Sequence, residues 1–222
     1  MVFRVDLKIF AFLILFYFTK QIEIYLVILI FACIHEFSHF LAGICLKMKL
    51  KKITLMPVGL SIEFSLTKND YNKKVLKSNI LEIKKIIIAI AGPMVNILIS
   101  LCLMMLKIEG SLIKTIIYSN ILIAVFNLIP IYPLDGGRIL KSILCLIVGR
   151  KRANIHMNRM SNLGLFFITF IFSILIYDWK NLSLIFILIY LWYIVLKENK
   201  IHKMRFRIYE MIEKNQKNMY NK

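Results

Sequence analysis

The stretch Ile34-His35-Glu36-Phe37-Ser38-His39-Phe40 decides how the rest of this sequence is interpreted. It is a His-Glu-x-x-His pattern inside a mostly apolar run, Tyr25 to Leu46, that is long enough to cross a bilayer as a helix. Residues four apart share one helix face, so His35 and His39 can bind one zinc ion while Glu36 accepts a proton from its water. Ionisable side chains within a membrane span each cost about 2.5–3.5 kcal/mol and usually mark a functional site.

The composition places this pattern in a membrane protein. Of the 222 residues, 59% are hydrophobic, whereas a soluble domain has about 45–50%. The formal net charge is +18, but the basic residues lie between the apolar runs. This arrangement favours control of topology and attraction to anionic lipids, and it argues against nucleic acid as a partner.

The apolar runs predict an all-α polytopic membrane protein with about six transmembrane helices. The first run is short, and we expect residues from Val2 onward to extend it. It has no small-residue cleavage site after Phe18, so we interpret it as an anchor and not a signal peptide. The last two have about 15 apolar residues each and need flanking residues such as Met160 and Trp179, or local thinning, to cross. The six predicted spans are Ile9 to Phe18, Tyr25 to Leu46, Ile86 to Leu106, Leu112 to Ile131, Leu163 to Tyr177 and Leu182 to Leu196.

Charge and patterning predict the organisation around these spans. With both termini in the cytoplasm, most of the 30 Lys and Arg residues fall in the inside segments. Between spans two and three, residues 53–66 contain alternating apolar residues around Pro57 and Gly59. This pattern predicts a small β-hairpin-like insert or a re-entrant ribbon. We expect a membrane-embedded domain over residues 1–196, with its core at 25–138, and a basic cytoplasmic tail over 197–222.

Zinc needs a third protein ligand, and Asp135 is the best candidate. Pro130 and Pro133 must end the fourth span, and the glycines at 136 and 137 allow a tight turn, so a carboxylate here can point back at span two. The alternative is that Asp135 pairs with Arg138 in a loop that merely ends the helix. The remaining histidines, His156 and His202, lie in basic segments and are expected on the surface.

Polar and small residues elsewhere in the spans leave alternatives open. Gly92, Pro93 and Asn96 are either a packing notch in span three or, with Asn127 and Gly136, part of the surroundings of the metal or substrate. No two of the four cysteines form a Cys-x-x-Cys pair, so a disulfide framework or a cysteine-built zinc site is not expected.

Three motifs together resemble the site-2 protease family. They are His-Glu-Phe-Ser-His at 35–39, Gly-Pro-Met-Val-Asn at 92–96 and Asn-Leu-Ile-Pro-Ile-Tyr-Pro-Leu-Asp-Gly-Gly at 127–137. Their kind, order and spacing match the intramembrane motifs of that family. The six-span frame and the lack of a PDZ insert are most similar to the stage IV sporulation protein FB branch.

The resemblance implies an intramembrane zinc metalloprotease with one Zn²⁺ per chain. His35, His39 and Asp135 would bind the ion, and Glu36 would activate water to cut a membrane-associated protein at bilayer depth. It further implies an integral protein of the bacterial cytoplasmic membrane, a sigma-factor precursor as substrate during sporulation, and regulatory membrane proteins as partners. Members of this branch often carry a CBS domain after the last span, and about 26 residues after Leu196 are too few for one.

Three other functions remain as alternatives. Metal transport would need ionisable residues spaced through several helices, whereas here they form one compact cluster. A catalytically inactive scaffold would not need an intact set of His35, Glu36, His39 and Asp135. A membrane-anchored zincin with a downstream glutamate ligand would need a helical acidic motif, and neither Glu63 nor Glu82 lies in one.

Overall fold

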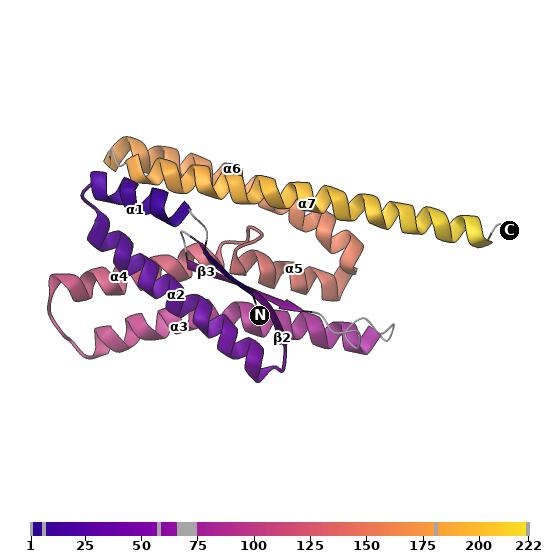
Figure 1. Ribbon diagram of the computed structural model, residues 1–222, viewed down its shortest axis with the longest axis horizontal. Helices are drawn as coiled ribbons and strands as arrows, with labels where there is room; N and C mark the ends of the chain where they lie inside the picture. Colours follow the sequence, from indigo (N-terminus) through magenta and orange to yellow (C-terminus); the bar gives the residue numbers. More distant parts are fainter. Residues whose placement is uncertain (1, 6–7, 57–58, 66–74, 180–181, 221–222) are drawn as a thin grey trace.

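The computed structural model describes the chain except for residues 1, 6–7, 57–58, 66–74, 180–181 and 221–222 (Figure 1). The helices pack into a bundle, with a small sheet lying beside α2 and a C-terminal helix that extends beyond the other helices (Figure 1). In chain order the elements are β1 (Val2–Val5), α1 (Lys8–Phe18), α2 (Ile22–Cys45), β2 (Lys49–Met56), β3 (Gly59–Ser65), α3 (Val75–Met105), α4 (Ser111–Leu128), α5 (Asp135–Val148), α6 (Arg150–Trp179) and α7 (Leu182–Tyr220).

Four helices among the described residues are long and apolar enough to cross a membrane. The candidate spans are Ile22–Cys45 of α2, Asn79–Met105 of α3, Ser111–Leu128 of α4 and Arg152–Tyr177 of α6. The first predicted span is α1, whose 11 residues measure about 16 Å against a hydrocarbon core of about 30 Å. Neither α1 nor α7 meets the criterion within the described residues, so four of the six predicted spans are supported.

Two helices begin earlier than the apolar runs predict. α3 begins at Val75 and not near Ile86, and it continues through Pro93 without a break. α6 begins at Arg150, so its membrane-crossing part is 26 residues long and needs no thinning of the bilayer. In both cases the helix already includes the polar or basic residues that precede the apolar run, because a helical backbone does not require apolar side chains.

The sheet adds strands to a fold that the sequence predicted to be all-α. The segment expected to hold a hairpin contains β2 and β3, which pair antiparallel. β1 pairs with β2 in parallel, giving the order β1-β2-β3. The expectation that residues from Val2 onward extend the first span is therefore wrong: Val2, Phe3 and Val5 are β-branched or aromatic and form a strand instead. Pro57 lies outside the described residues.

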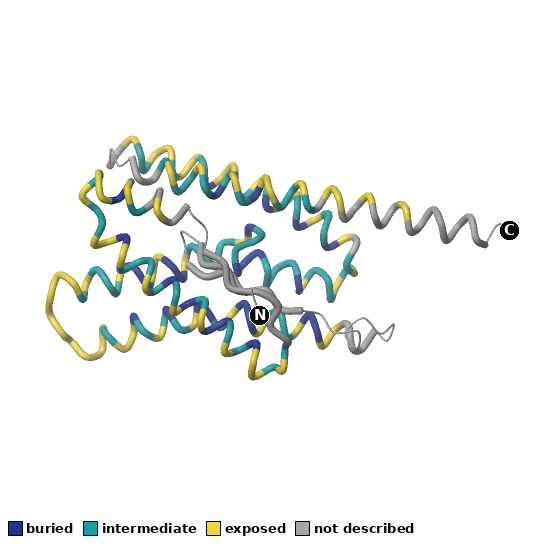
Figure 2. Tube along the Cα trace, viewed as in Figure 1, coloured by how far each residue is buried: buried dark blue, intermediate teal, exposed yellow. Residues whose placement is uncertain are grey.

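Polar side chains line the interior of the bundle, whereas large apolar side chains cover its outside. His35, His39, Asn96, Asn120 and Asp135 are buried, each at most 4% exposed. Exposed positions follow the outer faces of α4, α6 and α7 (Figure 2), and they include many large apolar residues. So much exposed apolar surface is unfavourable in water, so the distribution fits a protein surrounded by lipid.

A compact apolar cluster holds the segment between α4 and α5 against the last two helices. Its buried members are Ile131, Leu165, Ile168, Leu191 and Val195. Ile131 comes from the connecting segment, Leu165 and Ile168 from α6, and the other two from α7. The cluster therefore fixes the residues that lead directly into Asp135.

Candidate active site

Three buried ligand atoms meet at one point between α2 and α5. Nε2 of His35 and Nε2 of His39 lie 3.2 Å apart, and Oδ2 of Asp135 lies 2.9 Å and 3.1 Å from them. In a tetrahedral zinc site with bonds of about 2.0–2.1 Å, neighbouring ligand atoms are separated by about 3.3 Å. The three separations are close to this value, and the donor set of two imidazoles and one carboxylate is one that zinc accepts, so these residues fit a zinc ion.

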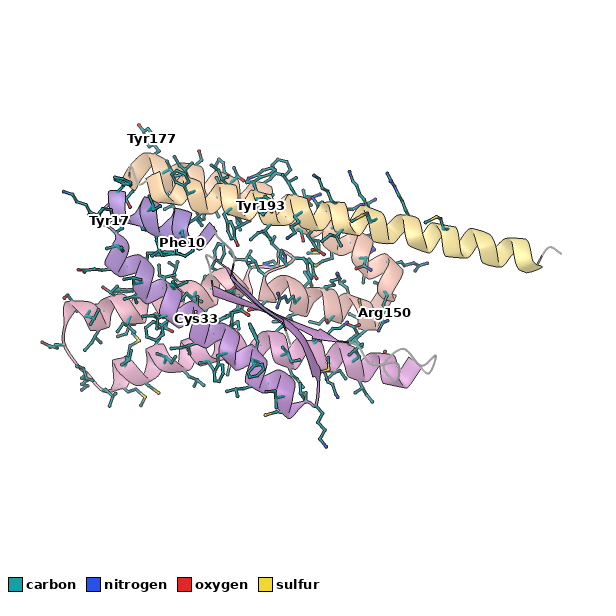
Figure 3. The ribbon with its side chains drawn as sticks, viewed as in Figure 1. Phe10, Tyr17, Cys33, Arg150, Tyr177 and Tyr193 are labelled. Carbon is teal, nitrogen blue, oxygen red and sulfur yellow. The ribbon has the colours of Figure 1, made fainter. Side chains whose placement is uncertain are left out.

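The helix α2 presents both imidazoles because they are one turn apart. The rings are nearly perpendicular, at 89°, with centroids 4.8 Å apart, so both Nε2 atoms converge although the side chains stack along the helix. Figure 3 shows α2 packed across the middle of the bundle, with Cys33 on the same helix. Cys33 is half-buried and is not part of the ligand cluster.

A backbone carbonyl on α3 fixes the ring of His39. Nδ1 of His39 lies 2.6 Å from the carbonyl oxygen of Ile88. A carbonyl can only accept, so Nδ1 carries the proton, and in the neutral ring Nε2 keeps its lone pair for a metal. One turn later Pro93 has no N–H to donate to the carbonyl of Ala89, which weakens the backbone ladder of α3 beside this contact.

Asp135 is positioned by the abrupt turn between α4 and α5. α4 ends at Leu128, two residues before Pro130, because the residue before a proline is disfavoured in helical conformation. The backbone N–H of Leu134 then donates to the carbonyl of Ile131 at 2.8 Å, and α5 begins at Asp135. A carboxylate in the first turn of a helix is also stabilised by the helix dipole.

The two glycines after Asp135 serve close packing and not the predicted tight turn. Both lie inside the first turn of α5. A Cβ atom on Gly136 would overlap the backbone carbonyl of Leu128, and one on Gly137 would overlap the backbone of Ile131 and Tyr132. Their missing side chains let α5 start directly against the end of α4 and the connecting segment, which is what points Asp135 back at α2.

The same segment is anchored on α6 by two contacts that the sequence analysis missed. The side chain of Ile131, which is fully buried, fits against Gly164, where a Cβ atom would come within 2.7 Å of its Cγ1. The backbone N–H of Tyr132 donates to Oγ of Ser161 at 3.0 Å. Nothing in the spacing of these residues links them to Asp135, so the sequence offered no signal for this support.

The two oxygens of Asp135 have different partners, so its pairing with Arg138 does not exclude its contact with the histidines. Oδ2 faces the histidines, while Oδ1 lies 3.6 Å from the guanidinium of Arg138. Asp135 lies outside the four candidate spans. Its burial raises the pKa of the carboxyl, but the hydrogen bonds with His35 and His39 and the charge of Arg138 outweigh this, so the pKa lies below its ordinary range. The carboxyl is therefore kept ionised, as a metal ligand must be.

Glu36 lies beside the cluster without being part of it. It follows His35 on α2 and is half-buried. It is adjacent to His35 in the chain and is not among the three residues whose ligand atoms converge within the described part of the chain. A carboxylate that is near a metal site but does not bind the ion is free to act as a base.

Among the other predicted site residues, Gly92 lies closest to the ligand cluster. A Cβ atom on it would come within 2.5 Å of Nε2 of His39 and 2.6 Å of Nε2 of His35. Pro93 and Asn96 are buried on the same helix, and neither amide atom of Asn96 has a partner among the described residues. Asn127 is half-buried, and its amide donates to the carbonyl of Ile123 on its own helix at 3.0 Å.

The structure does not bring the remaining candidates to the site. His156 is exposed on α6, and the side chain of His202 lies outside the described part of the chain. Glu82 is buried, but it pairs with Lys85 at 2.9 Å and with Arg150 at 3.4 Å, where α6 begins (Figure 3). It is not among the ligand atoms that converge within the described residues, and the side chain of Glu63 is not described.

Comparisons with known proteins agree with this geometry. The sequence profile of peptidase family M50 matches residues 23–111 and 107–172. A zinc metalloprotease of Methanocaldococcus jannaschii is 31% identical over 128 residues, which cover 54% of this chain and 34% of that protein. Stage IV sporulation protein FB of Bacillus subtilis is 27% identical over 126 residues, 55% of this chain and 40% of that protein. The chain thus spans between a third and two fifths of the length of these relatives.

The fold comparison extends further along the chain. The solved structure of a site-2 protease from Methanocaldococcus jannaschii matches with a TM-score of 0.64 at 22% identity, covering 87% of this chain and 88% of the other. That match shows the same fold, and the family profile covers more than half of the sequence, including all three motifs. The resemblance inferred from the motifs is confirmed, and the chain belongs to peptidase family M50.

Proposed function

We propose that this protein is an intramembrane zinc metalloprotease that hydrolyses a peptide bond in a membrane-associated protein. The observation that carries the proposal is the convergence of His35, His39 and Asp135 within 3.2 Å of one another, beside Glu36. The two histidines lie on α2 and contact α3, two of the four helices long and apolar enough to cross a membrane, which supports chemistry at bilayer depth. Family membership supports both the metal and the reaction class.

The roles of the residues follow from their positions. When bound by His35, His39 and Asp135, one zinc ion supplies a Lewis acid that polarises the scissile carbonyl and lowers the pKa of attacking water toward about 7. Glu36 removes the proton from that water and returns it to the leaving amine. Ile88 holds the ring of His39, and Arg138 holds the second oxygen of Asp135, so the ligands keep their orientation through the reaction.

The finer assignment concerns substrate and setting. Similarity to stage IV sporulation protein FB supports a sporulation role, with an inactive sigma-factor precursor as the candidate substrate and membrane proteins as regulators. We place the protein in the bacterial cytoplasmic membrane with both termini inside, where the basic residues meet anionic lipid. Metal transport and an inactive scaffold are the alternatives. The compact cluster with an adjacent glutamate favours hydrolysis over both.

The decisive experiment compares wild type with Glu36→Gln at equal abundance in membranes that contain a membrane-tethered sigma-factor precursor. Glutamine keeps the size of the side chain but cannot accept the proton, so cleavage should fall by about 10²–10⁴-fold while the zinc content stays at one per chain. Glu23→Gln is the matched control, because Glu23 is an exposed glutamate on the same helix and should be neutral.

Each alternative predicts a different result in these measurements. Zinc uptake into vesicles that is unchanged by Glu36→Gln would indicate a transporter. Equal cleavage by wild type and Glu36→Gln would exclude Glu36 as the base and assign the activity to another protein. Absence of bound zinc in the purified wild type would remove the metalloprotease function altogether.

A further inference from the structure

The two histidines of the cluster differ in how their second ring nitrogen is satisfied. Nδ1 of His39 has the carbonyl of Ile88 as its acceptor. Nδ1 of His35 is buried and has no hydrogen-bond partner among the described residues. A histidine that binds a metal through Nε2 almost always donates from the other nitrogen to a carboxylate, a carbonyl or a water, so His35 needs an acceptor that its immediate contacts do not provide.

A matching group lies on the neighbouring helix. Asn96 is fully buried, and neither its amide oxygen nor its amide nitrogen has a partner within the described residues. It follows Gly92 by one turn of α3, and Gly92 faces Nε2 of His35 directly. Residues four apart share one face of a helix and lie about 6 Å apart along it, so Asn96 faces α2 one turn beyond the ligand atoms.

A second unsatisfied amide lies at the same level. Oγ of Ser100 lies 3.1 Å from the carbonyl oxygen of Asn96 on its own helix and 3.3 Å from that of Ile117, so Ser100 lies beside Ile117 of the antiparallel helix α4. Asn96 precedes Ser100 by one turn, so it lies level with Asn120 on α4. Asn120 is also fully buried, and its amide oxygen has no partner in the described part of the chain. Buried amides that are unsatisfied in this way usually hold an ordered water.

We propose that Asn96 is a positioning residue for zinc binding, and that it accepts the proton of His35 Nδ1 through one buried water shared with Asn120. The water makes three hydrogen bonds, to His35, Asn96 and Asn120, which is the usual number for a buried water. This link holds His35 in the tautomer that leaves Nε2 free for the metal, as Ile88 does for His39. The inference builds on the proposed function, because it assigns a role toward the same zinc site.

The test is the affinity of the purified full-length protein for Zn²⁺, measured by competition with a zinc chelator. Asn96→Leu keeps a similar side-chain volume but removes the acceptor, so the affinity should fall by about 10–100-fold. Asn96→Asp restores a strong acceptor and should retain the wild-type affinity. Asn199→Leu is the matched control, because it is the same substitution at a half-buried asparagine on α7, whose amide donates to Asn162 and not to the cluster, and it should leave the affinity unchanged.

Thermal unfolding without zinc separates positioning from folding. A purely structural role for Asn96 would lower the unfolding midpoint of the zinc-free Asn96→Leu protein and leave the zinc affinity of the folded protein intact. A positioning role lowers the zinc affinity of the folded protein, whatever the change in the midpoint. If Asn96→Leu does not fold, Asn96→Ala is measured instead by the same criterion.

The outcomes distinguish this inference from the proposed function. If wild type binds one zinc and His39→Ala does not, the site exists. Equal zinc affinity of Asn96→Leu and wild type would then overturn the role of Asn96 alone. If wild type itself binds no zinc, the proposed function fails, and the inference fails with it.

Discussion

At His35 and His39, the spacing in the sequence determines most of the site. Two histidines one helical turn apart can only converge if the segment is a helix, and the apolar run that contains them requires one. Asp135 could be predicted as the third member of the cluster as well, because two prolines must break the chain just before it. What supports these ligands could not be predicted, since the carbonyl of Ile88 is present in any residue and carries no sequence signal.

Gly92 lies so close to the histidines that it limits what can occupy this position. In Gly92→Ala, the new methyl group would come within 2.5–2.6 Å of both Nε2 atoms, so the rings must move. We expect zinc affinity to fall by at least about tenfold, as for other changes that misalign ligands. The measurement is chelator competition on purified protein.

A glycine remote from the site provides the comparison for that substitution. Gly110 lies between α3 and α4, and the nearest side-chain atom to a Cβ there is 3.7 Å away, an ordinary contact. Gly110→Ala should therefore bind zinc like wild type. Unchanged affinity in Gly92→Ala would mean that α3 does not approach the ligands as closely as described.

At the scale of elements, the break between α4 and α5 explains both a successful prediction and a wrong one. The prolines correctly predicted that α4 is broken here, although it ends at Leu128 and not at the predicted Ile131. The glycines were expected to make a turn, but they allow α5 to pack against the end of α4. Glycine permits both uses, and only the position of the neighbouring backbone decides between them. That position depends on α6 and α7, which no local pattern specifies.

The contact between Ile131 and Gly164 should control the position of Asp135. In Gly164→Ala, a methyl group within 2.7 Å of Ile131 would push the connecting segment away from α6. A catalytic group that is misplaced by about 1 Å can reduce the rate by about 10²-fold. We therefore expect kcat/KM to fall by up to that amount, while His35 and His39 keep their positions.

A double-mutant cycle identifies the cause of that loss. Ile131→Ala removes the side-chain atoms that would clash, so adding Gly164→Ala to it should cost much less than in wild type. The kcat/KM values of the two single variants and the double variant give the coupling. Fully additive losses would show that Gly164 acts through some other contact.

At the scale of the whole molecule, composition and apolar runs predicted a membrane protein with most of its spans. They could not predict β1, because four residues at the N-terminus contain too little pattern to separate a strand from the start of a helix. The predicted last span ends at Leu196 and the predicted basic tail begins at residue 197, and α7 runs through both, from Leu182 to Tyr220. Apolar composition marks where lipid ends, which is not where a helix must end.

The orientation of the molecule can be tested by labelling with a membrane-impermeant thiol reagent. With the four native cysteines replaced by serine, Glu109→Cys in the exposed turn between α3 and α4 should react in intact cells. Met211→Cys, at an exposed position on the C-terminal half of α7, should react only after permeabilisation. The reverse pattern would place the C-terminal half of α7 outside and contradict the charge-based orientation.

The packing of Ile131 also sets the order in which the protein can become functional as it is synthesised. His35 and His39 emerge early, but Asp135 lies 100 residues after His35, and the cluster that holds its connecting segment is completed only by Leu191 and Val195. A nascent chain therefore carries two of the three ligands for most of its synthesis without a formed site. The proposed zinc site therefore cannot be completed until the chain has been made and inserted as far as Val195.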